Sequence, residues 1–158
     1  MKMKLQIATA LSHDAKLLIM DEATTGLDPV VRNEILDIFL EYMGDGERTI
    51  FMSSHITTDL EKAADSVTFI DRGNLLLTGY KDDILDTHGM MRCTKKELDE
   101  IDKADFISAR ITEFGADILT ADRASAARRY SGVMIEKPTL EDIILYYVKE
   151  KTSKVWTA

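Results

Sequence analysis

The sequence predicts an α/β protein in which a parallel sheet with covering helices precedes a smaller α+β unit. Two short apolar runs, residues 17–20 and 49–53, lead directly into polar residues, as expected for strands buried on both faces of a parallel sheet. Between them, residues 30–42 repeat apolar side chains at helical spacing, and Pro29 suits the first turn of that helix. After residue 89 the pattern of apolar and polar residues changes, which indicates that a second unit begins there.

The first part of the chain, residues 1–89, carries further helix and turn signals. Residues 1–11 resemble the middle of an amphipathic helix, with no capping residue before them. The helix at 30–42 is expected to bury the face that carries Val31, Ile35, Ile38 and Tyr42, with Gly44 and Gly46 closing it. The other expected elements are a helix capped by Thr57 or Thr58 that runs to residue 64, a hairpin of strands 66–71 and 75–78 around Arg72-Gly73-Asn74, and a helix over 81–88 stopped by Gly89.

Residues 90–158 are predicted to form a small α+β accessory domain. Residues 90–93 are interpreted as a connector into it, and Thr94 with Glu97 forms a capping-box pattern at the start of a short helix. The later expected elements are a strand within 106–114, a helix over 122–130, a strand at 133–135, and a helix over 139–149 that packs Leu140, Ile143, Ile144 and Tyr147 on a small sheet.

Composition and charge argue against several classes of protein. The 158 residues are 45% hydrophobic, enough to bury a core, and carry a formal net charge of −8 with a pI near 4.9. Such a chain is a poor match for the phosphates of DNA or RNA, so no nucleic-acid partner is expected. The single Cys93 fits a reducing compartment, and no apolar segment is long enough to span a bilayer. We therefore expect a cytoplasmic chain that reaches a membrane only through a partner.

Several other polar residues have simple interpretations. His13 and His88 are expected to be solvated at helix ends or in loops. Cys93 has no companion ligand that would suggest a metal site. The pair Arg128-Arg129 is expected on an exposed helix face, with a phosphate contact as the alternative interpretation.

The strongest chemical signal is the pair Asp21-Glu22, which follows the first apolar run directly. An aspartate at a strand end can hold Mg²⁺, usually through water, while that ion bridges the phosphate oxygens of a nucleotide. The next side chain points to the other side of the turn, where Glu22 can orient an attacking water or accept its proton. The alternative is an ordinary buried strand that ends in a solvated acid.

Two more polar motifs follow these acids. Residues 23–29, with the sequence ATTGLDP, form a turn signal in which Asp28 caps the next helix. The triplet Ser53-Ser54-His55 ends the second apolar strand. Because neighbouring parallel strands bring their C-terminal ends to one edge, His55 is expected to reach the phosphate that Glu22 faces. A histidine after a strand can equally be structural.

In their order and linkage, these motifs resemble the ATP-binding subunits of ABC transporters. Residues 17–22 resemble the Walker B strand with the catalytic glutamate after it, residues 25–28 the D-loop, and residues 54–55 the switch-histidine loop. Residues 1–11 resemble the helix that follows the signature motif. The tail at 136–147 is similar to the C-terminal extension of bacterial drug- and antibiotic-export ATPases of the bacitracin-export type. The implied fold is the C-terminal part of a P-loop NTPase sheet, as found in ABC ATPases.

The resemblance implies an energy-coupling subunit that hydrolyses ATP with Mg²⁺ for a bacterial exporter of drugs or antibiotics. In that mechanism Asp21 holds the magnesium ion, Glu22 acts on the attacking water, and His55 contacts the γ-phosphate. Ser54 adds a contact to the nucleotide, and Asp28 reaches across to a second ATPase subunit, in a homo- or heterodimer arranged head to tail. Transmembrane permease subunits are the further partners, and they hold the protein peripherally on the inner face of the cell membrane.

The phosphate-binding parts of that family have no match in the 158 residues. There is no glycine-rich Lys-Ser/Thr loop, no glutamine loop and no complete signature motif. The chain is therefore expected to be a C-terminal fragment that by itself binds ATP weakly and hydrolyses none. Two alternatives stay open. One is a non-catalytic regulatory or structural piece that binds a partner ATPase, and the other is a non-transport ABC-type ATPase, such as a DNA-repair or chromosome-organising protein.

Overall fold

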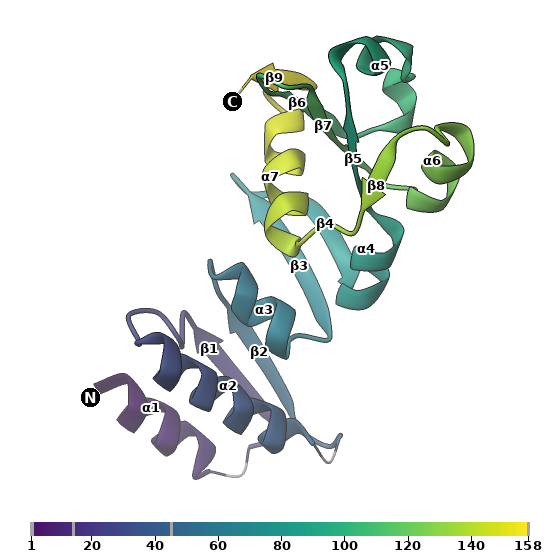
Figure 1. The fold of residues 1–158 in the computed structure, drawn as a ribbon. Coiled ribbons are helices and arrows are strands. Elements are labelled where there is room, and N and C mark those ends of the chain that lie inside the picture. The colour runs from purple at the N-terminus through teal and green to yellow at the C-terminus, as the bar shows by residue number, and fades with distance from the viewer. Residues whose placement is uncertain (1, 14, 45, 158) are drawn as a thin grey trace. The chain divides into compact units, whose positions relative to one another are not determined.

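A computed structural model describes residues 2–13, 15–44 and 46–157 of the chain. It is a mixed α/β protein with parallel and antiparallel sheets, as the sequence predicts (Figure 1). The chain divides into two compact units, a first unit of Met1–Ala64 and a second unit of Asp65–Ala158. Within the described ranges, no helix combines the length and the apolar content that crossing a bilayer requires.

The first unit packs helices on one face of two parallel strands. Its elements are α1 (Lys2–Leu11), β1 (Leu17–Asp21), α2 (Pro29–Met43), β2 (Thr49–Ser53) and α3 (Thr57–Ala63). Strands β1 and β2 pair in parallel, in a register that places Asp21 opposite Ser53. Helices α1 and α2 lie against one face of the strands (Figure 1), around the buried residues Ile7, Ala23, Ile35, Leu36, Phe39 and Ala63. Full burial of one such leucine or phenylalanine side chain contributes about 1.5–3 kcal/mol.

Only one face of this two-stranded sheet is covered by the described residues. Leu17 and Ile19 of β1 are 54% and 75% exposed, and Phe51 of β2 is 68% exposed. The prediction of strands buried on both faces is therefore wrong for this structure. The reason is that α1 and α2 supply a single layer, which covers the side chains of alternate residues such as Leu18.

Helix α2 begins and ends where the sequence predicts. The Asp28 carboxylate accepts the backbone N–H of Val31 at 3.1 Å, Pro29 stands in the first turn, and Gly44 ends the helix. The predicted buried face is only partly correct, because Ile38 is exposed. The side chains that α2 buries are those of Ile35, Leu36 and Phe39.

The second unit joins a β-hairpin to a five-stranded sheet. The hairpin consists of β3 (Ser66–Asp71) and β4 (Asn74–Tyr80), and the sheet has the order β8-β5-β7-β6-β9. Its strand pairs are antiparallel except for β6 with β9. The other elements are α4 (Lys81–Thr87), β5 (Gly89–Cys93), α5 (Lys95–Glu100), the 3-10 turn η1 (Lys103–Asp105), β6 (Ser108–Ile111), β7 (Ala116–Thr120), α6 (Arg123–Arg129), β8 (Met134–Glu136), α7 (Leu140–Glu150) and β9 (Val155–Thr157).

The sequence predictions miss part of this sheet. Residues 90–93, interpreted as a connector, lie in β5, which pairs with both β7 and β8, so the connector prediction is wrong. Strands β7 and β9 have no counterpart among the predicted elements. The division at residues 89 and 90 stays a prediction: the five-stranded sheet begins at Gly89, whereas the compact units divide after Ala64.

Local turn and cap signals are more successful. The capping box of Thr94 and Glu97 is confirmed, and Thr139 forms a second one at the start of α7. The hairpin turn holds Arg72 and Gly73 at φ values of 48° and 77°, as a tight two-residue turn requires. The predicted cap of α3 is wrong, since the residue before its first turn is Ile56, which makes no side-chain cap.

His88 departs most clearly from its predicted environment. The sequence predicts a solvated side chain, but His88 is only 4% exposed, while His13 is exposed as predicted. The Nδ1 atom of His88 lies 2.7 Å from the carbonyl oxygen of Ile84, and its Nε2 atom lies 3.0 Å from the hydroxyl of Tyr147. The prediction fails because α7 covers the end of α4 through that tyrosine.

Candidate functional site

The candidate site lies where β1 and β2 end. Because the strands are parallel and Asp21 pairs with Ser53, the residues after each strand leave the sheet at the same edge. The structure brings Asp21, Glu22 and His55 together at this edge, as expected from the sequence. Open α/β sheets bind their ligands at this edge, which makes it the first place to look for chemistry.

The backbone of Glu22 adopts an uncommon conformation. Its φ of 50° lies in the left-handed region, which costs a residue other than glycine on the order of 1–2 kcal/mol. Two backbone hydrogen bonds hold the turn: the N–H of Glu22 donates to the carbonyl of Ser53 at 3.1 Å, and the N–H of Thr25 donates to the carbonyl of Glu22 at 3.1 Å. These bonds keep Glu22 in its strained backbone conformation, and that conformation directs its side chain toward the end of β2.

One carboxylate oxygen of Glu22 receives two donors. Its Oε2 atom lies 2.6 Å from Nδ1 of His55 and 2.6 Å from the hydroxyl oxygen of Thr25. Since an ionised carboxylate only accepts hydrogen bonds, Nδ1 carries the proton in this contact. The Thr25 hydroxyl, followed by His55, holds the pKa of Glu22 below its usual value. The group is therefore ionised at neutral pH.

Asp21 is held by a residue that the sequence predictions did not assign. The hydroxyl of Ser53 donates to Oδ1 of Asp21 and accepts the N–H of Glu22 at 3.2 Å. In the sequence, Ser53 is only the first member of a polar triplet. Its position directly opposite Asp21 in the parallel register is the signal that identifies it, and that register becomes visible only in the folded sheet.

The remaining two predicted residues make local contacts. Asp28 is exposed, and its Oδ1 atom accepts the N–H of Val31 as the cap of α2. The hydroxyl of Ser54 accepts the N–H of Ile56 at 3.0 Å, which shapes the loop before α3. In the described structure these two contacts are structural. The roles of Asp28 and Ser54 toward a nucleotide or a second subunit stay predictions.

The donor set at this edge suits a magnesium ion that is bound together with a nucleotide. Among the described residues, no cluster of three or more His, Cys, Asp or Glu side chains is arranged as a complete metal cage. Mg²⁺ does not need such a cage, because it usually takes one or two carboxylates and completes its shell with water and substrate phosphates. Asp21 offers one exposed carboxylate, so its chemistry fits that mode of binding.

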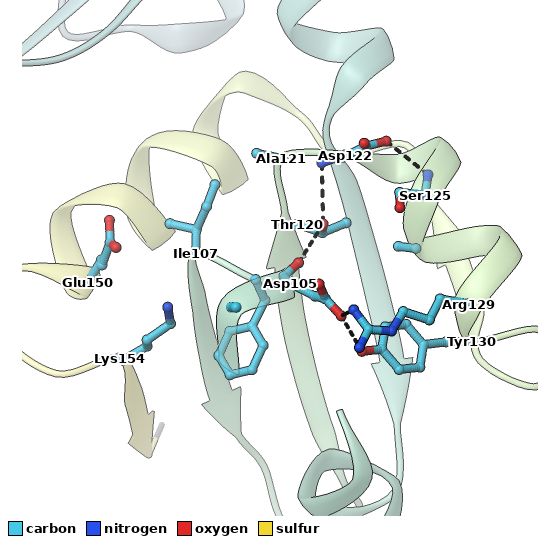
Figure 2. Close-up of a pocket in the computed structure, with 13 residues that line it drawn as sticks. Asp105, Ile107, Thr120, Ala121, Asp122, Ser125, Arg129, Tyr130, Glu150 and Lys154 are labelled. Carbon is cyan, nitrogen blue, oxygen red and sulfur yellow. Dashed lines mark hydrogen bonds and ion pairs between the residues drawn. The ribbon is translucent and has the colours of Figure 1, made fainter. Parts of the chain in front are cut away.

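Apart from this edge, a hollow of about 390 Å³ lies in the second unit (Figure 2). On one side Asp105 accepts hydrogen bonds from Nη1 of Arg129, at 2.6 Å, and from the hydroxyl of Tyr130. The carbonyl of Asp105 accepts the Thr120 hydroxyl at 2.8 Å. These contacts tie α6 and β7 to the η1 turn. Arg129 lies on an exposed helix face, as predicted, and its guanidinium binds the carboxylate of Asp105.

The chain is similar in sequence to proteins that are named as transport ATP-binding proteins. The Putative ABC transporter ATP-binding protein of Mycoplasma pneumoniae is 45% identical over 78 residues, which are 49% of this chain and 24% of that protein. The Bacitracin transport ATP-binding protein BcrA of Bacillus licheniformis is 43% identical over 76 residues, 48% of this chain and 25% of that protein. About half of this chain is therefore similar in sequence to ATP-binding proteins of ABC transporters.

Another similarity extends over most of the chain. Nod factor export ATP-binding protein I of Cupriavidus pinatubonensis is 31% identical over 156 residues, which are 92% of the chain and 48% of that protein. The chain spans about a quarter to a half of the length of these curated relatives. No protein-family model matches it. The resemblance of the ABC motifs and the similarity to these relatives therefore point to the same family.

Proposed function

We propose that this chain supplies the magnesium- and water-handling residues of an ATP-hydrolysing subunit in a bacterial ABC exporter of drugs or antibiotics. The observation that carries the proposal is the contact of 2.6 Å between Glu22 and His55 at the shared end of two parallel strands. It joins a carboxylate and an imidazole at the sheet edge where nucleotide phosphates bind in α/β proteins.

Each residue at this edge has chemistry that suits one task. Glu22 is ionised and half-buried, so it can orient the water that attacks the γ-phosphate and accept its proton. Because its pKa is lowered, it is a weak base, which favours orientation of the water before proton transfer. His55 presents a ring N–H, and its exposed imidazole can turn toward the γ-phosphate.

Magnesium and the nucleotide complete this proposed site. Mg²⁺, when bound, neutralises the charge that develops on the transferring phosphate. Asp21 would hold it, directly or through water, and Ser54 would add a contact to the nucleotide. The phosphate-cradling loop that the family uses has no match in these 158 residues, so these residues form only part of a complete ATP site.

The proposed partners follow from the names of the relatives, which describe transport and export. We propose that the protein works with transmembrane permease subunits on the inner face of the cell membrane. A second ATPase subunit would face it head to tail, as a homo- or heterodimer. Asp28 is exposed on the loop before α2, and there it can meet that second subunit while one of its oxygens caps the helix.

The test is Glu22→Gln in the complete transporter. This change keeps the size of the side chain and removes the base, so ATP turnover should fall by about 10²–10⁴-fold while ATP binding stays measurable. Glu34→Gln, an exposed position on α2, is the matched control and should leave turnover unchanged. Full turnover by Glu22→Gln would refute the assigned role. Loss of both turnover and binding would indicate a structural role instead.

A further inference from the structure

We infer that Ser53 is a positioning residue that fixes both acidic residues of the site through a single hydroxyl group. The hydroxyl donates to Oδ1 of Asp21, and it accepts the N–H of Glu22 at 3.2 Å. This inference rests on the proposed function, because it assigns Ser53 to the magnesium-handling side of that site. A residue from β2 thereby sets the geometry of two neighbours at the end of β1.

The arrangement follows from the register of the sheet. Asp21 and Ser53 are direct partners in the parallel pairing, and both are exposed on the face that α1 and α2 leave uncovered. A serine hydroxyl can donate one hydrogen bond and accept others at the same time. Ser53 therefore holds one oxygen of Asp21 and leaves the other oxygen of that carboxylate to face a ligand.

The Ser53 hydroxyl is not needed for the strand pairing itself. The backbone carbonyl of Ser53 already accepts the N–H of Glu22 at 3.1 Å, so the sheet keeps its hydrogen bond without the side chain. The side chain is exposed and adds little to the core. The hydroxyl instead orients Asp21, and it accepts a second hydrogen bond from the left-handed turn at Glu22. Outer partners of this kind commonly tune metal sites.

A matched set of variants separates the hydroxyl from the size of the side chain. Ser53→Thr keeps the hydroxyl, and Ser53→Val has nearly the shape of threonine without it. Ser53→Ala repeats the loss of the hydroxyl with a smaller side chain, in case valine disturbs folding. Thr49→Ala removes a hydroxyl at the other end of β2, opposite Leu17, and serves as the control.

The first measurement uses the 158-residue chain without metal or nucleotide. NMR spectra should show that Ser53→Val and Ser53→Ala shift the side-chain carboxyl carbon of Asp21 and the amide proton of Glu22. Ser53→Thr and Thr49→Ala should leave both resonances close to their original positions. If neither resonance moves in Ser53→Val and Ser53→Ala, the positioning role is overturned.

The second measurement uses the complete ATPase with Mn²⁺ as a spectroscopic substitute for Mg²⁺. Loss of the hydroxyl should weaken Mn²⁺ binding, measured by electron paramagnetic resonance with a non-hydrolysable ATP analogue, by about 10- to 100-fold, and threonine should restore it. The Mg²⁺ concentration for half-maximal turnover should rise in parallel. Equal losses in the threonine and valine variants would overturn the inference, because side-chain size rather than the hydroxyl would then decide the effect.

The two proposals fail in different ways. If Glu22→Gln leaves turnover intact while the Ser53 variants still shift the Asp21 and Glu22 resonances, the hydrolysis role is overturned although the contact exists. If Glu22→Gln abolishes turnover while the Ser53 variants change neither the resonances nor the Mn²⁺ affinity, only the positioning role is overturned.

Discussion

The Nδ1 atom of His55 lies 2.6 Å from Oε2 of Glu22, although 33 positions separate the two residues along the chain. The parallel pairing of β1 with β2 produces this contact, because the two strands end at the same edge. The same oxygen accepts the hydroxyl of Thr25, at 2.6 Å. Through this one oxygen atom, the end of β1 contacts both the end of β2 and the turn before α2. Loss of either donor, Thr25 or His55, should therefore change the pKa of Glu22.

Replacing Thr25 by valine should raise the pKa of Glu22. The Thr25 hydroxyl is the largest cause of the lowered pKa, and its loss removes a hydrogen bond that favours the ionised form. The pKa should move back toward the usual value of 4.5, as measured by NMR titration of the side-chain carboxyl carbon. Thr58→Val, at an exposed position on α3, should not change it. An unchanged Glu22 pKa in Thr25→Val would contradict the contact.

The same shift sets the sign of a pH effect on stability. A pKa that is lower in the folded chain means that the unfolded chain binds protons more readily at acid pH. The contribution of Glu22 is therefore fully present above its usual pKa of 4.5, and it is lost as the pH falls through the lowered value. Denaturation curves of Thr25→Val between pH 3 and pH 6 should show less of this acid sensitivity than the original chain.

The 158-residue chain alone should bind MgATP only weakly. Backbone N–H groups of a glycine-rich loop supply most contacts to nucleotide phosphates in P-loop ATPases, and no such loop occurs in the sequence. Calorimetry should give no saturating isotherm at millimolar nucleotide. A partner that supplies such a loop should restore binding. Tight binding by the chain alone would mean that the site is built differently and that the family mechanism does not apply.

The sequence predicts the positions of Asp21, Glu22 and His55 better than the surroundings of the site. Asp21, Glu22 and His55 are placed correctly because apolar runs mark the strand ends, and parallel strands bring those ends together. The contribution of Ser53 is not predictable in the same way, since it depends on the register that sets it opposite Asp21. Whether a strand is covered on one face or two depends on the surrounding layers, which periodicity does not reveal. Exposed Ile19 is an example.

The second unit shows a different limit of sequence interpretation. Strand β7 is largely buried on both faces, so it has no alternation of apolar and polar residues to mark it. Strand β5 contains methionine and arginine rather than β-branched residues, and its pairing with β7 joins segments far apart in the sequence. The capping box of α5 is predicted although these two strands are not, because Thr94 contacts Glu97, only three positions away.

Cys93 should react slowly with alkylating reagents in the folded chain. Burial, followed by the charges of Glu97 and Asp117, raises the pKa of its thiol from 9.0 to about 11. The thiolate is the reactive form, so this rise lowers its fraction at neutral pH by roughly 100-fold. Labelling by iodoacetamide at pH 7.5 should be correspondingly slower in the native chain than in denaturant. Equal rates in the two states would show that Cys93 is accessible and unperturbed.

Replacing Thr139 by alanine should destabilise the second unit. The Thr139 hydroxyl accepts the N–H of Asp142 at 3.1 Å, and the Asp142 carboxylate accepts the N–H of Thr139 at 3.0 Å. Loss of such a cap lowers the free energy of unfolding by about 0.5–2 kcal/mol. Thr139→Ser keeps the hydroxyl and should retain most of the stability. Chemical denaturation monitored by far-ultraviolet circular dichroism distinguishes the two variants.

Acidification should destabilise the second unit through His88. The Nδ1–H group donates to the carbonyl of Ile84, so Nε2 is the acceptor for the Tyr147 hydroxyl, and the buried ring is neutral. Burial lowers the pKa of His88 below its usual value of 6.5. The unfolded chain then binds a proton at a higher pH than the folded chain does, so folding stability falls as the pH drops below 6.5.

Two measurements check the behaviour of His88. In NMR titrations, the ring of His88 should change protonation at a lower pH than an exposed histidine does. In denaturation experiments between pH 7.5 and pH 5, His88→Gln should lose part of the acid sensitivity of the original chain. Glutamine carries no titrating proton, although it loses some packing at every pH. His13→Gln, at an exposed position, should keep the original slope. If both variants keep that slope, another group causes the acid sensitivity. If His88 titrates at or above 6.5, its ring is not buried as described.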